Sequence, residues 1–182
     1  MKKLAQLNDH VTFYLIDSMN ENIIHFSRGL EAMLNEKSGT PNGKTLSMQF
    51  IEDDIEVAIA MTYGPYDTRL SYVDNVRTFS HGTHVLGLYE GVFEVAKKYI
   101  ENEVKESIDI AINEVIENLN FIIRIKLDSP QFVGAVRQEL TNEEVRSAVK
   151  KGIIKKLPLM LESDESVTHH FQWPSRDVKY KC

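Results

Sequence analysis

Gly82-Thr83-His84 is the first stretch of this sequence whose residue types and spacing could do chemistry. It stands directly before apolar residues that recur at three- and four-residue spacing, which predicts a helix. Glycine allows another backbone to approach closely, threonine can cap a helix, and the free amides of a helix start can meet an anion. Taken alone, the triplet predicts a helix start and nothing more.

The second candidate is a cation-rich stretch in an acidic chain. The formal net charge is -6, which argues against nucleic-acid binding driven by charge alone. From Arg124 to Lys156, however, eight cations outnumber four acids. The simpler interpretation is a solvated helix surface. The alternative is a DNA-facing surface formed by Arg124, Lys126, Arg146 and Lys150.

Other reactive residue types predict no catalytic residue and no metal site. His169 and His170 lie near Trp173 but have no cysteine or carboxylate partner at ligand spacing. The single cysteine, Cys182, excludes an internal disulfide and fits a cytoplasmic setting. The sequence contains no Walker loop, zinc spacing or Ser/His/Asp arrangement.

Length and composition predict one folded domain without a membrane segment. The 182 residues are enough to bury a core. A content of 42% hydrophobic and 26% charged residues is typical of a soluble globular protein. No apolar run approaches the roughly 20 residues that span a bilayer, and the first residues turn polar too early for a signal peptide.

The first half of the chain predicts mainly strands. They are expected at residues 11–16, 23–26, 46–51, 55–61 and 68–73. Residues 55–61 alternate strictly, with Ile55, Val57, Ile59 and Met61 on one face, which predicts a half-buried strand. A short helix is expected from about 29 to 35.

The second half predicts helices around one long strand. Helices are expected at about 83–101 and 108–117, and a strand at 119–127. Thr141-Asn142-Glu143-Glu144 has the capping-box pattern of a further helix, which Pro158 is expected to limit. Grouped antiparallel strands with a few helices on one side predict an α+β domain.

Five ordered elements of the sequence resemble the transducer domain of the B subunits of DNA gyrase and topoisomerase IV. They are Leu4-Ala5-Gln6-Leu7-Asn8, Phe26-Ser27-Arg28-Gly29-Leu30, His81-Gly82-Thr83-His84-Val85-Leu86-Gly87, Pro130-Gln131-Phe132-Val133-Gly134 and Asn142-Glu143-Glu144-Val145-Arg146-Ser147-Ala148-Val149. The family carries Gly-Gly-Thr-His-x-x-Gly at the third element, so His81 replaces its first glycine. The resemblance spans Leu4 to Leu157.

This resemblance implies the fold of ribosomal protein S5 domain 2, a mostly antiparallel sheet with helices packed on one face. We therefore expect residues 1–161 to form a transducer-like domain and residues 162–182 to form an irregular C-terminal tail. The family motif Gly82-Thr83-His84 would then have a structural role.

The resemblance also implies a place in an ATP-dependent type II DNA topoisomerase, which is an isomerase. In the family, one lysine of a Gln-Thr-Lys loop contacts the γ-phosphate of ATP. Here the loop reads Gly134-Ala135-Val136-Arg137. Arg137 keeps the charge and would contact phosphate with a forked geometry. Ala135 and Val136 offer no side-chain hydrogen bonds.

The implied function is to couple ATP binding and hydrolysis to subunit closure and DNA strand passage. ATP and Mg²⁺ would be bound only by a separate N-terminal ATPase domain, which the resemblance places outside these residues. This chain alone would have no turnover. Its expected partners are the ATPase and TOPRIM domains of the same subunit, the A subunit of the topoisomerase, and DNA, with no membrane.

Two further interpretations stay open. Where the family has arginine and glycine before the long strand, this chain has Ile116 and Asn118. Together with Ala135 and Val136, these departures favour a divergent or repurposed subunit, such as a standalone module that has lost ATP sensing and binds a protein through its sheet face. The third interpretation is an S5-type domain that binds nucleic acid through the cation-rich stretch, with an affinity that falls steeply with salt.

Overall fold

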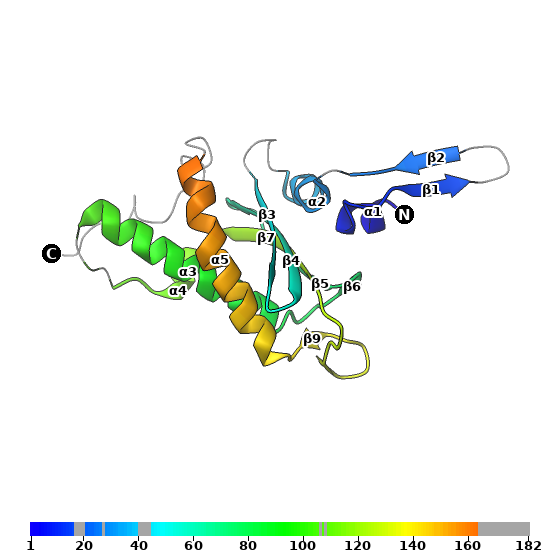
Figure 1. Ribbon diagram of the computed structural model, residues 1–182. Helices are drawn as coiled ribbons and strands as arrows, with labels where there is room; N and C mark the ends of the chain where they lie inside the picture. Colours follow the sequence, from blue (N-terminus) through cyan, green and yellow to red (C-terminus); the bar gives the residue numbers. More distant parts are fainter. Residues whose placement is uncertain (17–20, 27, 40–44, 106, 108, 164–182) are drawn as a thin grey trace.

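A five-stranded mixed sheet forms the centre of the protein in the computed structural model, which describes residues 1–16, 21–26, 28–39, 45–105, 107 and 109–163 (Figure 1). The strand order is β3-β4-β7-β5-β6. The strands are β3 (Leu46–Glu52), β4 (Ile55–Tyr63), β5 (Arg69–Val73), β6 (Val76–Arg77) and β7 (Leu119–Lys126). β5 runs parallel to β7 and the other neighbours are antiparallel. The α+β class is therefore confirmed.

Two long helices cover one face of the sheet. They are α3 (Thr83–Val104) and α5 (Glu143–Ser163), with the short α4 (Ile112–Ile116) beside them. Their apolar residues pack with the residues of β4 that were predicted to share a face: Ile55, Val57, Ile59 and Met61. Leu88 and Val92 of α3 and Val149 and Ile153 of α5 are completely buried in this core.

Two shorter helices cover the opposite face, so helices lie on both faces of the sheet rather than on one. α1 (Lys2–Leu7) and α2 (Gly29–Ser38) pack on Ala58 and Ala60 of β4 and Ile122 of β7. The strand expected at 55–61 is present, but the prediction that it is half-buried was wrong, because α1 and α2 bury its second face. Small alanine side chains on the second face let α2 approach closely, and a strand buried on both faces is the result.

A hairpin extends from this body. β1 (Phe13–Ile16) pairs antiparallel with β2 (Glu21–Ile24), and the pair projects beyond α1 and α2 (Figure 1). β2 begins two residues before the strand that was expected at 23–26. Tyr14, Ile16 and Ile23 are 60%, 71% and 63% exposed. These apolar side chains therefore lie outside both cores of the domain.

The last helix is longer than its sequence suggested. α5 passes through Pro158 and ends at Ser163, so the expectation that the proline limits the helix was wrong. Proline removes one helical hydrogen bond, but Leu157 and Leu161 on either side are buried and hold the last turn against the core. Glu162 and Ser163 are thus helical, and the rest of the expected tail lies outside the described residues.

No helix within the described ranges is both long and apolar enough to cross a membrane.

Candidate functional site

A small hairpin after the long strand presents the candidate phosphate contact. It consists of β8 (Phe132–Val133), β9 (Glu139–Leu140) and the turn between them, and is named here the Arg137 hairpin. Gly134 and Arg137 both adopt positive φ angles, +71° and +54°, and so reverse the chain within the turn. The turn residues, including Ala135 and Val136, are exposed. The guanidinium of Arg137 lies 5.6 Å from the centre of the Phe132 ring, a cation–π distance.

The hairpin is hydrogen-bonded to the segment that precedes α3. The Ser80 amide donates to the Gln138 carbonyl at 2.9 Å, and the Leu140 amide donates to the His81 carbonyl at 3.1 Å. Gly82 lies so close that a Cβ atom there would be 2.2 Å from the Leu140 carbonyl oxygen, and its φ is +122°. The two segments that the sequence singled out, far apart along the chain, thus lie side by side.

The base of the hairpin is also joined to the start of α5. The Thr141 amide donates to the Gln131 carbonyl at 2.9 Å, and the Gln131 amide donates to Oδ1 of Asn142 at 2.6 Å. The predicted capping box was therefore wrong in detail, because the Thr141 hydroxyl donates to the Gln131 carbonyl rather than capping the helix. The hairpin is fixed to the beginnings of both long helices.

A buried polar cluster lies behind the start of α3. Oγ of Ser71 on β5 lies 2.6 Å from Oγ1 of Thr78 and 2.8 Å from Nδ1 of His81, and Nε2 of His84 lies 3.4 Å from Oγ1 of Thr78. Burial, together with the nearby His81, lowers the pKa of His84 to about 3, so His84 is neutral at physiological pH. The cluster ties β5 to α3 and has the character of a structural network.

The sequence analysis did not identify Ser71 and Thr78 as members of this buried polar cluster. A serine inside the apolar strand Arg69–Val73 was the available signal, but its partners lie on the segment that follows β6. Thr83 departs from expectation as well: Gly82 occupies the cap position of α3, and the Thr83 hydroxyl is buried without a hydrogen-bond partner among the described residues. The role assigned to Thr83 as a helix cap was wrong.

The candidate DNA-facing cations do not form one surface. Arg124 is the clearest correction, because its side chain is only 3% exposed and lies 2.8 Å from Glu56. Lys126 lies 3.0 Å from the same carboxylate. Both side chains are on the sheet face that carries α1 and α2, since Arg124 pairs in register with Ala58 and also donates to Asn8. The N-terminal helices α1 and α2 cover this face of the sheet, so it offers no open surface for DNA there.

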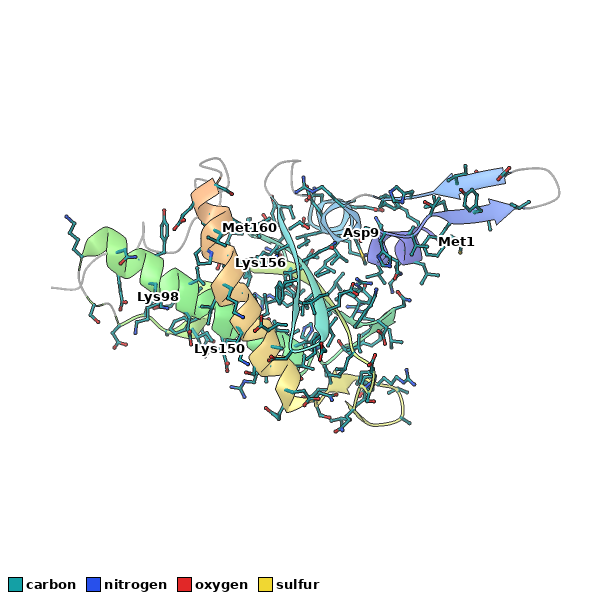
Figure 2. All side chains as sticks on the ribbon, in the orientation of Figure 1. Met1, Asp9, Lys98, Lys150, Lys156 and Met160 are labelled. Atoms are coloured by element: carbon teal, nitrogen blue, oxygen red, sulfur yellow. The ribbon has the colours of Figure 1, made fainter. Side chains whose placement is uncertain are left out.

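Arg146 and Lys150 lie on the other side of the sheet and join α5 to α3. Nε of Arg146 donates to Glu90 at 3.0 Å, and Nζ of Lys150 lies 2.5 Å from Glu94. Figure 2 shows Lys150 on α5, on the side of α3. Each of the four candidate cations therefore has a carboxylate partner, and the cation-rich stretch is largely neutralised.

Within the described part of the chain, no three histidine, cysteine or acidic residues gather in an arrangement that could hold a metal ion. His169, His170 and Cys182 lie outside the described residues.

Comparison with known proteins places the chain in a family of topoisomerase subunits. The family model described as DNA gyrase B matches residues 7–170. The chain therefore belongs to the DNA gyrase B family.

Its relatives are much longer proteins. Over 164 residues it is 31% identical to the DNA gyrase B protein of Staphylococcus aureus, a match that covers 83% of this chain and 26% of the relative. Over 170 residues it is 25% identical to the DNA gyrase B protein of Archaeoglobus fulgidus, a match that covers 90% of this chain and 27% of the relative. The chain spans about a quarter of the length of these relatives.

Solved structures share the fold. The topoisomerase IV ATP-binding domain of Francisella tularensis superposes with a TM-score of 0.81 at 24% identity, over 96% of this chain and 50% of that one. The 43K ATPase domain of Thermus thermophilus gyrase B superposes with a TM-score of 0.75 at 17% identity, again over 96% and 50%. At these identities the likeness concerns the fold alone.

Proposed function

We propose that this chain is the transducer domain of a type II DNA topoisomerase B subunit. It would couple ATP binding and hydrolysis in a separate ATPase domain to subunit closure and DNA strand passage. The observation that carries the proposal is the placement of Arg137, an exposed cation on a turn whose base is hydrogen-bonded to the starts of α3 and α5. Membership of the DNA gyrase B family supports it.

The chemistry of the site fits a single contact with a nucleotide that another domain holds. A guanidinium stays protonated at any physiological pH and can offer two parallel N–H donors to a phosphate. Ala135 and Val136 can add only backbone groups. ATP and Mg²⁺ would be bound by the ATPase domain, and Arg137 would report the presence of the γ-phosphate.

The hairpin supplies a route by which that contact could reach the rest of the domain. A force on Arg137 passes through the Gln138 and Leu140 backbone to the start of α3, and through Gln131 to the start of α5. The proposed partners are the ATPase and TOPRIM domains of the same subunit, the A subunit and DNA, in the cytoplasm. Because Arg124 is buried, we assign it no part in DNA contact.

A chimeric protein tests the proposal. This chain replaces the matching segment of Staphylococcus aureus DNA gyrase B, and ATP hydrolysis is measured with the A subunit and DNA. A charge-assisted hydrogen bond contributes about 1.5–3 kcal/mol, so Arg137→Ala should lower hydrolysis by about tenfold or more. Arg137→Lys should retain most of the activity.

Lys151→Ala is the matched control, since Lys151 is an exposed cation of α5 paired with Asp53. It should leave hydrolysis unchanged. Hydrolysis that is insensitive to Arg137→Ala in a folded chimera would rule out the phosphate contact.

The exposed apolar hairpin favours a second candidate, an interaction module without a nucleotide role. Tyr14, Ile16 and Ile23 are solvent-exposed on β1 and β2, whereas both faces of the central sheet are covered by helices. Such a module would therefore bind through the hairpin and not through a sheet face. Capture of a topoisomerase subunit that is lost in Ile16→Ser and independent of Arg137 would favour this candidate.

A further inference from the structure

His81 lies where the Arg137 hairpin meets the central sheet, and it contacts both. Its carbonyl accepts a hydrogen bond from the Leu140 amide of the hairpin at 3.1 Å. Its imidazole Nδ1 lies 2.8 Å from Oγ of Ser71, a completely buried residue of β5. A single residue therefore joins the hairpin, through its backbone, to the sheet, through its side chain.

The backbone of His81 adopts a conformation that needs support from its surroundings. Its φ is +62°, in the left-handed region that glycine adopts readily and histidine rarely. Such a conformation persists in a non-glycine residue only where neighbouring contacts hold it, and it is most common at functional sites. The imidazole makes these contacts, with Ser71 and with the Phe121 ring, whose centre lies 6.1 Å away.

The imidazole of His81 is neutral at physiological pH. Burial lowers its pKa, and the nearby guanidiniums of Arg77 and Arg69 lower it further. A neutral ring adds no third positive charge beside these two arginines, and its nitrogens can pair with a hydroxyl that both donates and accepts. The contact with Ser71 is therefore compatible with the cationic surroundings of the ring.

We propose that His81 is a positioning residue, whose side chain anchors the Arg137 hairpin to β5 and so sets where Arg137 is presented. Ser80, directly before His81, adds a second bond to the hairpin, from its amide to the Gln138 carbonyl at 2.9 Å. Because Gln138 directly follows Arg137, a shift of His81 also shifts the turn that carries the guanidinium. The inference rests on the proposed function in one step only, the contact of Arg137 with phosphate.

Amide hydrogen exchange in this chain tests the anchor without any nucleotide. His81→Gly keeps the backbone donor and acceptor, relieves the positive φ and removes the imidazole. Exchange at the Leu140 amide should become several-fold faster, because the hairpin opens more often. Ser71→Ala removes the other half of the contact and should have the same effect, which keeps the test decisive if His81→Gly disturbs the fold.

Asp54→Gly is the matched control. Asp54 is an exposed residue in the turn between β3 and β4, and its φ of +63° is nearly the same as that of His81. The substitution relieves the same backbone conformation without removing a contact to the hairpin, so exchange at the Leu140 amide should not change. Unchanged exchange in both His81→Gly and Ser71→Ala would overturn the inference.

The chimera with Staphylococcus aureus DNA gyrase B separates this inference from the proposed function. His81→Gly should lower ATP hydrolysis several-fold when Arg137 is present and should have no further effect in Arg137→Ala, because the anchor acts through that side chain. Equal losses in both backgrounds would show that His81 only stabilises the fold, and would also overturn the inference. If Arg137→Ala itself leaves hydrolysis unchanged, the proposed function fails, and the exchange of the Leu140 amide still decides whether His81 is the anchor.

Discussion

The Leu140 amide donates a hydrogen bond to the His81 carbonyl at 3.1 Å, and this contact joins the Arg137 hairpin to the start of α3. His81 adopts a positive φ of +62°, a conformation that costs a non-glycine residue energy. Its ring is held in place by Ser71 at 2.8 Å and lies beside the Phe121 ring. The sheet thus positions the backbone that carries the hairpin.

Gly82→Ala should destabilise the domain and loosen the hairpin. A Cβ atom would overlap the Leu140 carbonyl, and φ is also positive. Gly39→Ala is the matched control, because Gly39 has a φ of +70° but, apart from its chain neighbours, no atom of the described residues lies within 4 Å of its Cβ position. We expect Gly39→Ala to cost about 1 kcal/mol and Gly82→Ala about 1–3 kcal/mol more in urea unfolding. Equal costs would contradict the close approach.

His84 should make the stability of the domain depend on pH. Its folded pKa of about 3 lies below the ordinary value of 6.5, so the unfolded chain binds the proton first as pH falls. The contribution of neutral His84 is complete above about pH 6.5 and is lost on descent toward pH 3, with a slope of up to about 1.4 kcal/mol per unit.

Denaturant unfolding from pH 7 to pH 4 measures this dependence. His84→Gln should flatten it, because the substitution removes the buried imidazole. An unaltered slope in His84→Gln would assign the acid sensitivity to other groups.

Arg124→Ala should act on stability and not on DNA binding. It removes a buried guanidinium that contacts Glu56 and Asn8, at a cost of about 2–4 kcal/mol. Lys151→Ala breaks an ion pair that is half exposed on both sides and should cost less than about 1 kcal/mol. Thermal unfolding measures both, and a filter-binding assay across salt concentrations should give the same DNA affinity for each. A selective loss of DNA binding in Arg124→Ala would refute the buried assignment.

Local patterns predicted local structure well. The stripe Val85, Leu88 and Val92 predicted α3, and the alternation of Ile55, Val57 and Ile59 predicted a strand and the face that packs against α3 and α5, but not the burial of its second face. The parallel pairing of β5 with β7 has no local signal, because α3 and α4 intervene between the two strands.

In the candidate site, too, local structure was predictable from the sequence and long-range contacts were not. A glycine before a helix is visible in the sequence, but its contacts are not. That Gly82 lies against Leu140, and that α1 and α2 bury Arg124, depends on how distant segments pack. The expectation that Pro158 limits α5 failed for a related reason: the burial of Leu161 against the core offsets the hydrogen bond that the proline removes.

The ion pairs between α3 and α5 match one register of the two helices. Glu90 faces Arg146 and Glu94 faces Lys150, one turn further along each helix. A slip of one turn in one direction would bring Lys150 against Lys98, and a slip in the other would leave Arg146 opposite the apolar Leu86. A shift of one helix past another by one turn, about 5.4 Å, is a known form of conformational switch. The pairing of Glu90 with Arg146 and of Glu94 with Lys150 disfavours such a shift between α3 and α5. If the Arg137 hairpin is displaced, α3 and α5 should therefore move together as one rigid body.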